Sequence, residues 1–236
     1  MRTVGLVIAL AVVGCGGGGG KAQDAGDDTP ADVARGGDAG PDAAPDAAPT
    51  ATGCTALATP SSTFTNTICG PWGAASGAAM VENDMMQTLR ITPSGTSTSD
   101  GTCTSNATTI ISDGGYFMEV PTPILATAGY TTLRHTALDV AINSRDNKLR
   151  LTNAIGTVTI AQVPFVMGAM RWWRLRPDRT TNEIIGEYSA DANAWYELGR
   201  VARTLNMSGF LVVAAGSESP TASVGFADID NLNVCP

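Results

Sequence analysis

The sequence predicts an all-β protein whose folded part is a two-sheet antiparallel sandwich. After Gly53, short segments rich in β-branched and aromatic residues alternate with turns of Gly, Pro, Asn and Asp. No segment there has a clear helical period; the best candidate, Ala74–Met86, is interrupted by glycine. We therefore expect one sandwich domain over Cys54–Pro236, a length that can bury a sizeable core.

The first fourteen residues have the layout of a signal peptide. Arg2 is followed by the apolar run Val4–Val13, which is too short to span a bilayer comfortably. Gly14 then precedes Cys15, and this junction resembles the lipobox of bacterial lipoproteins, in which the cysteine is acylated. The resemblance implies a palmitate-type lipid anchor on Cys15 and, because Gly16 follows, an outer-membrane location in a Gram-negative-type bacterium. An ordinary secretory signal is the alternative.

Residues 15–53 are predicted to be a disordered tether behind the acylated cysteine. The segment is made of Gly, Ala, Asp and Pro, without aromatic residues, and carries seven Asp against Lys21 and Arg35. Such a composition cannot bury enough apolar surface to offset chain entropy. Residues 1–14, 15–53 and 54–236 are therefore expected to be the signal peptide, the tether and the sandwich.

The domain itself is read as a series of strands and turns. The expected strands are Gln87–Thr92, Ala107–Ile111, Tyr116–Val120, Thr136–Ile142, Lys148–Asn153, Gly156–Val163, Met170–Arg176, Glu183–Ser189, Trp195–Val201, Gly209–Ala215 and Gly225–Val234. Pro93–Ser105, composed mainly of Ser, Thr, Gly and Asp, is expected to be a loop.

Met170–Leu198 is the most informative stretch, because it reads as a hairpin followed by a third strand. With Pro177–Asn182 as the loop, Arg176 would oppose Glu183 and Trp173 would oppose Gly186. One face of the hairpin would then be charged, whereas the other, with Trp173 and Leu175, could be buried.

The same residues carry a resemblance to a known family. The order WWRLR, EIIGEYS and SADANAW, with the terminal ADIDNLNV, resembles the concanavalin A-like (laminin-G-like) jelly-roll domains. The resemblance covers the last third of the chain and implies a jelly-roll sandwich. It implies fold more firmly than function, because the family includes lectins and glycosidases.

The four cysteines of the domain predict two disulfides. An even number of cysteines in an exported chain is typical of disulfide pairing, and the spacing lacks the Cys-x-x-Cys pattern of metal sites. Three connectivities are open. First and last strands are commonly neighbours in jelly rolls, so the resemblance favours Cys54–Cys235, which leaves Cys69–Cys103.

The sequence does not point to an enzyme. His135 is the only histidine, and no Gly-x-Ser-x-Gly motif accompanies it, so a structural role is expected. The alternating acids of the family's glycosidases are absent; Glu183 and Glu187 are about 13 Å apart along one strand. Asp228 and Asp230 alternate suitably, but a role in capping turns is favoured. No cofactor, metal site or nucleic-acid partner is expected.

A binding role remains. Trp172, Arg174, Arg176 and Glu187 would form a face with an aromatic plate and charged hydrogen-bonding groups, which suits glycan recognition. In that role Trp172 would lie on a concave, partly open face. The alternative, which is favoured, is that one Trp lies in a second core layer and the Arg and Glu side chains form cross-strand pairs on a solvated face.

The resemblance to laminin-G-like domains also allows a calcium site, for which Asp100, Asp191 and Asn193 could supply oxygen ligands, but turn formation is favoured for the last two. We expect a membrane-tethered binding module for a glycan or cell-envelope ligand. The alternatives are a degenerate glycoside hydrolase and a structural envelope lipoprotein. Nothing in the sequence sets the oligomeric state.

Overall fold

The computed structural model describes residues 48–236 except 58–59, 66–67, 78, 84, 95–98, 154–155 and 221–222. The predicted signal peptide, Cys15 and the predicted tether as far as residue 47 lie outside the described residues. Within the described part, no helix has the length and apolar character needed to cross a bilayer. The lipid anchor at Cys15 therefore stays a prediction.

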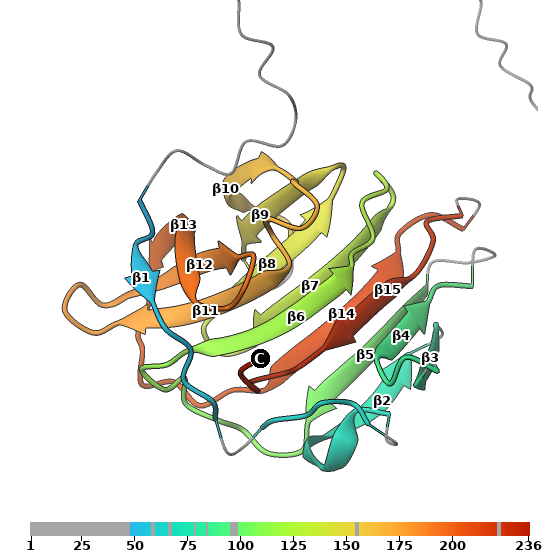
Figure 1. The fold of residues 1–236 in the computed structure, drawn as a ribbon, viewed down its shortest axis with the longest axis horizontal. Coiled ribbons are helices and arrows are strands. Elements are labelled where there is room, and N and C mark those ends of the chain that lie inside the picture. Colours follow the sequence, from blue (N-terminus) through green and yellow to red (C-terminus); the bar gives the residue numbers. More distant parts are fainter. Residues whose placement is uncertain are drawn as a thin grey trace, which may run out of the picture. The chain divides into compact units, whose positions relative to one another are not determined.

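Two antiparallel sheets make up the fold, as the sequence predicted (Figure 1). The eight-stranded sheet has the order β1 (Ala51–Thr52), β13 (Ala194–Ala202), β12 (Glu183–Ser189), β11 (Trp172–Asp178), β6 (Tyr116–Thr122), β15 (Ala227–Asp230), β4 (Leu89–Thr92) and β3 (Met80–Asn83). The seven-stranded sheet has the order β10 (Thr159–Pro164), β9 (Lys148–Thr152), β8 (Val140–Arg145), β7 (Gly129–His135), β14 (Leu211–Ser217), β5 (Ser99–Ser105) and β2 (Gly73–Gly77). The only helical element in the described residues is the short 3-10 turn η1 (Gly70–Trp72).

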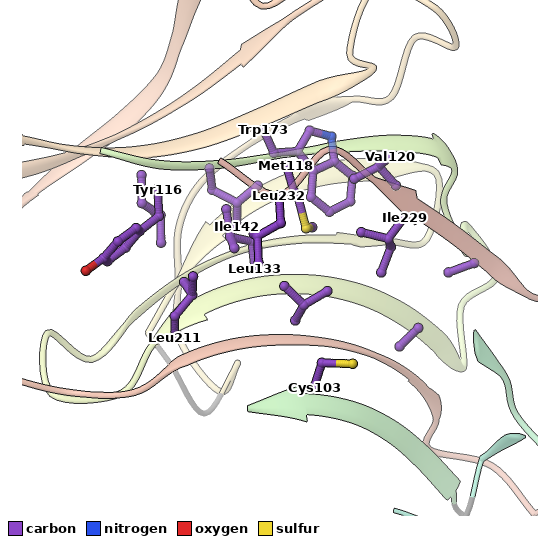
Figure 2. Packing of buried hydrophobic residues seen from close by; sticks show 14 of the residues in the cluster. Cys103, Tyr116, Met118, Val120, Leu133, Ile142, Trp173, Leu211, Ile229 and Leu232 are labelled. Carbon is purple, nitrogen blue, oxygen red and sulfur yellow. The ribbon is translucent and has the colours of Figure 1, made fainter. Parts of the chain in front are cut away.

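The core fills the space between the sheets. Trp173 and Met118 point from the eight-stranded sheet toward Leu133 and Leu211 of the seven-stranded sheet (Figure 2). All four side chains are fully buried. Alternate residues of each strand contribute to this layer, so the period-two pattern of the sequence is the pattern of the core.

The hairpin β11–β12 has the predicted faces but a register two residues away from the predicted one. Pro177 and Asp178 stay in the strand, so Arg174 opposes Glu187 and Leu175 opposes Gly186. The Asp178 carboxylate causes the difference, because it accepts hydrogen bonds from the backbone N–H groups of residues 180 and 181 and so begins the turn later. A shift of two residues leaves every side chain on its expected face, whereas a shift of one would not.

Several expected elements are corrected by the structure. Residues 136–139 form a turn, and the strand expected at Thr136–Ile142 begins only at Val140; the preceding strand β7 was missed. Pro93–Ser105 was expected to be a loop but contains β5, whose Gly-, Ser- and Thr-rich sequence is held by pairing with both β14 and β2. Ala74–Met86, the best helical candidate, forms β2 and β3. Ala107–Ile111 has only an isolated bridge at Thr109.

Both expected disulfides form. Cys54 bonds to Cys235 and Cys69 bonds to Cys103, with Cα–Cα separations of 5.9 and 5.3 Å. The first links the segment after β1 to the chain end beyond β15, and the second fastens the η1 turn to β5. Of the three possible connectivities, the one that the family resemblance favoured is confirmed.

His135 is structural, as expected. Its ring is fully buried and stacks on Tyr116 with ring centroids 5.9 Å apart. Nε2 lies 2.9 Å from the Thr109 carbonyl oxygen, and Nδ1 accepts a hydrogen bond from the Leu138 N–H at 3.3 Å. These partners define the neutral tautomer with the proton on Nε2. Burial lowers the pKa of His135, against the opposing effect of the Thr109 carbonyl.

Candidate functional site

The four residues predicted to bind a ligand do lie together, on the outer face of the eight-stranded sheet. Arg174 Nε donates to Glu187 Oε2 at 2.6 Å, and Arg176 NH2 lies 3.1 Å from Glu187 Oε1. The side chain of Glu187 is fully buried, and Trp172 and Arg174 are only 3% and 5% exposed. Arg176 alone is partly accessible. The expected grouping is therefore present, but most of it is enclosed.

A second, smaller apolar cluster covers these residues. Trp172 packs with Phe117 and Trp195 on the outer face, beneath the Cys54–Cys235 disulfide. The prediction that Trp172 lies on a partly open face is therefore wrong, and the favoured alternative, a Trp in a second core layer, is confirmed. The cover comes from the N-terminal segment of the domain, whose strand β1 pairs along β13. The strand pattern did not reveal that a sequence-distant segment would fold over this face.

The carboxylates considered for catalysis or metal binding are engaged in structural contacts. Asp228 is held by Arg90, whose Nε and NH2 lie 2.7 and 3.0 Å from its two oxygens. Asp191 Oδ1 accepts from Ser189 Oγ and from the backbone N–H of Asn193. These contacts match the favoured structural roles. Within the described ranges, no three His, Cys, Asp or Glu side chains are grouped as a metal site would require.

One carboxylate pair does converge. Asp230 and Glu119 are register partners of β15 and β6, on the outer face of the eight-stranded sheet. Burial raises the pKa of Asp230, and the charge of Glu119 adds to the effect. Glu119, however, contacts Arg171 through one oxygen and accepts from Asn231 Nδ2 through the other. Both oxygens of Glu119 are thus in contact with neighbouring side chains.

The outer face of the seven-stranded sheet is different in character. Residues that are paired from strand to strand form one line across all seven strands. All of them have polar side chains except one alanine. We call this set the polar row, and its members are Ser76, Thr102, Ala214, Thr132, Asn143, Arg150 and Gln162. Neighbouring strands are about 4.8 Å apart, so the row extends for roughly 29 Å. That length suits an extended chain of several sugar units.

Strand curvature shapes this face. In Figure 2 the strands that carry Leu133, Leu211 and Cys103 bow toward the core, so their opposite face is concave. Ala214 and Val212 point to this outer face and are nevertheless only 3% and 2% exposed. Their larger neighbours in the sheet cover them. We call this concave outer face of the seven-stranded sheet the recessed face.

Tyr130 is the aromatic residue of β7 on this face, two residues before Thr132 of the polar row. On the neighbouring strand β14, Tyr130 is paired with Gly216. Gly216 is paired in turn with Asp100 on β5. The absence of a side chain at Gly216 leaves one edge of the phenol ring without a neighbour on that strand. Burial, with a smaller contribution from the Asp100 charge, raises the pKa of Tyr130 to about 12, so the phenol remains a hydrogen-bond donor.

The sequence analysis did not predict a binding surface on this face, although the sequence contains the alternating pattern of one of its strands. The alternation of Tyr130, Thr132 and Arg134 with buried neighbours lies in a segment that was not read as a strand. Asn143 and Arg150 flank the Asp146-Asn147 turn and could be placed on one face only once the β8–β9 register was known.

Comparisons with known proteins agree with the fold. No protein-family model and no curated protein sequence matches the chain. Among solved structures, the Emp47p carbohydrate recognition domain matches with a TM-score of 0.54 at 12% identity, over 75% of this chain and 95% of that one. The VIP36 exoplasmic/lumenal domain in its Ca²⁺/Man3GlcNAc-bound form has a TM-score of 0.49 at 12% identity, covering 72% and 84% of the two chains. A legume lectin-like domain from Entamoeba histolytica has a TM-score of 0.48 at 10% identity, covering 70% and 89%.

The Emp47p match and the sheet topology show the class of fold. The described domain is an all-β sandwich of the legume-lectin-like, concanavalin A-like type, as the family resemblance implied. At such low identity the likeness establishes the architecture only.

Proposed function

We propose that this chain is a membrane-tethered, extracytoplasmic glycan-binding module that binds its ligand on the outer face of the seven-stranded sheet. The observation that carries the proposal is the polar row across a recessed face, with Tyr130 beside it. Carbohydrate recognition by the structural neighbours supports the same class of ligand.

The chemistry of the face suits sugars. Sugar hydroxyl groups both donate and accept hydrogen bonds. Part of the row is engaged within the protein, because Ser76 and Thr102 hydrogen-bond to each other, Thr132 donates to the Ile142 carbonyl oxygen and Asn143 donates to Thr152. The remaining acceptor lone pairs of these side chains, together with the exposed Gln162 and the partly exposed Arg150, can bind sugar hydroxyls. A partly exposed tyrosine ring offers an apolar plate for the C–H face of a sugar, while its hydroxyl stays polar. The proposed ligand is therefore an extended glycan lying across the strands.

Catalysis is not part of the proposal. The carboxylates Glu119, Asp228 and Glu187, all on the other sheet, are each held by arginine. A structural envelope protein without a glycan ligand is the competing function, and the binding experiment below decides between them.

The test is a glycan array probed with the full chain, followed by calorimetric titration of the strongest hit. We expect Tyr130→Ala and Gln162→Ala each to weaken binding about tenfold or more, the equivalent of about 1.4 kcal/mol. Arg200→Ala is the matched control, because Arg200 is on the outer face of the eight-stranded sheet with a side chain that is 43% exposed. Loss of binding in the control alone, or no hit on the array, would overturn the proposal.

The tether and its anchor need a separate test. A lipid on Cys15 would hold the module at the outer membrane, and the Asp- and Pro-rich segment would let it extend from the surface. Metabolic labelling with a fatty-acid analogue should mark the wild-type chain but not Cys15→Ala. Equal labelling of both chains would rule out the anchor.

A further inference from the structure

Cations gather at one end of the recessed face. Arg134 of β7, Arg145 of β8, and Lys148 and Arg150 of β9 all point to the outer side of the seven-stranded sheet. Arg145 is the cross-strand partner of Lys148, and Arg150 is two residues from Lys148 on the same strand, so the backbones of these three cations lie within about 10 Å of one another. Arg134 is opposite Ala141 and lies on the other side of the polar row. This concentration occurs in a chain whose formal net charge is −8. It is therefore a local feature of the face and not a consequence of overall composition.

The cations of β8 and β9 differ in how far their charge is compensated. Arg145 NH2 is paired with Glu218 Oε2 at 2.6 Å. Arg150 NH2 is 3.6 Å from Asp146 Oδ2, beyond ordinary hydrogen-bond length. Lys148 makes no ion pair with any described residue. Two of the three cations thus retain most of their capacity to bind an anion.

Arg150 provides the most specific indication. Its Nε atom is buried and has no hydrogen-bond partner among the residues that the structure describes. A buried N–H without a partner is costly, so such a group is usually satisfied by water or by a ligand. Arg150 is also a member of the polar row, between Asn143 and Gln162. Arg150 therefore lies on the path proposed for the glycan, with a partly exposed guanidinium group that its protein neighbours leave incompletely hydrogen-bonded.

We propose that the face selects acidic glycans, whose carboxylate or sulfate groups are bound by Arg150 and Lys148. This inference rests on the proposed function and specifies its ligand class. Guanidinium groups bind carboxylate and sulfate oxygens through paired, charge-assisted hydrogen bonds, which neutral hydroxyls cannot match. Tyr130 contacts an uncharged part of the sugar chain, and Asp100, on the far side of Gly216, keeps acidic groups away from that end. The face thus has a cationic end and an end for neutral sugar surface.

The experiment compares one glycan with and without its negative charges. Calorimetric titration of the full chain with hexagalacturonate and with its methyl ester measures the contribution of the carboxylates alone. A heparin-derived hexasaccharide and a panel of neutral hexasaccharides are titrated in parallel to separate carboxylate from sulfate recognition. We expect at least one of the two acidic ligands to bind about tenfold or more tightly than every neutral ligand, and its affinity to fall as salt is raised.

Variants of the outer face of the seven-stranded sheet test whether its cations cause the preference for acidic glycans. Arg150→Gln and Lys148→Gln should each weaken the acidic ligand by about tenfold and leave neutral ligands unchanged, whereas Arg200→Gln should alter neither. If neutral glycans bind as well as acidic ones, and Arg150→Gln has no effect, acid selectivity is wrong while glycan binding stands. If no glycan of either kind binds, the proposed function fails and this inference fails with it.

Discussion

The guanidinium carbon of Arg174 lies 4.0 Å from the centroid of the Trp195 ring, while its Nε is bonded to Glu187. The two residues come from β11 and β13, and Glu187 comes from β12 between them. Because the Arg174 side chain is ion-paired, stacked on an aromatic ring and shielded from water, its role is to hold the hairpin together. The positive charges of WWRLR, which suggested a binding surface, are thus mostly internal.

Glu187→Gln should be strongly destabilising. Two arginines depend on this one buried carboxylate, and removing one partner of a buried ion pair costs about 3–5 kcal/mol. Glu197→Gln is the control, since Glu197 pairs with Arg200 on an exposed part of the same sheet and should cost less than about 1 kcal/mol. Urea unfolding measures both. Equal losses in the free energy of unfolding would show that burial does not determine how much the ion pairs of Glu187 contribute to stability.

Trp172 and Trp173 should be similarly important for stability. Trp173 is in the main core and donates through Nε1 to the Met170 carbonyl oxygen at 2.8 Å, and Trp172 is in the smaller outer cluster. Truncating a buried tryptophan to alanine costs about 3–5 kcal/mol. An outward-facing Trp172 would instead cost less than about 1 kcal/mol. Thermal unfolding of the two alanine variants distinguishes these cases.

The two disulfides should differ in their contribution. Cys54–Cys235 spans 181 residues and Cys69–Cys103 spans 34, so the chain-entropy model assigns them about 5 and about 4 kcal/mol. Replacing both cysteines of each pair by serine and measuring unfolding under oxidising conditions gives the comparison. A larger loss from the shorter loop would show that local packing around η1 outweighs loop closure.

Stability should fall as pH drops below about 6.5. The pKa of His135 is lowered in the fold, so below the ordinary histidine value of about 6.5 the unfolded chain takes up a proton that the folded chain does not. This contribution is present above that value and is lost as pH falls through it. Because His135 is the only histidine, His135→Gln should flatten the dependence between pH about 7 and about 5. An unchanged pH slope in the variant would contradict the assignment.

The sequence predicted most of the architecture because strands are encoded by local alternation. Trp173 and Leu175 were assigned to the core because alternate residues of a strand face the same side. That assignment is correct although the predicted register is wrong by two residues, because a shift of two keeps each side chain on its face. Strand β5 was missed because its Ser, Asp and Gly residues have weak strand propensity, which outweighs that of its two threonines. It becomes a strand only between β14 and β2, which are distant in the sequence.

The site was harder to predict than the fold. A binding surface depends on which outer face is covered, and the cover over Trp172 comes from Ala51 and the Cys54–Cys235 disulfide. No local pattern near Trp172 encodes that contact. Conversely, Thr132, Asn143 and Arg150 meet in one row only through the registers of three strands, so the row could not be recognised from any single segment.

Backbone amide shift perturbation by NMR, with the strongest array ligand added to the full chain, tests the central claim most directly. If the ligand binds the recessed face, the largest shifts will be at residues 130–134, 143–150 and 212–216, on strands β7, β8, β9 and β14 and the turn between β8 and β9. The amides of Arg174 and Glu187 in the other sheet will remain unchanged. Largest shifts along β11 and β12, with the polar row unaffected, would contradict the account.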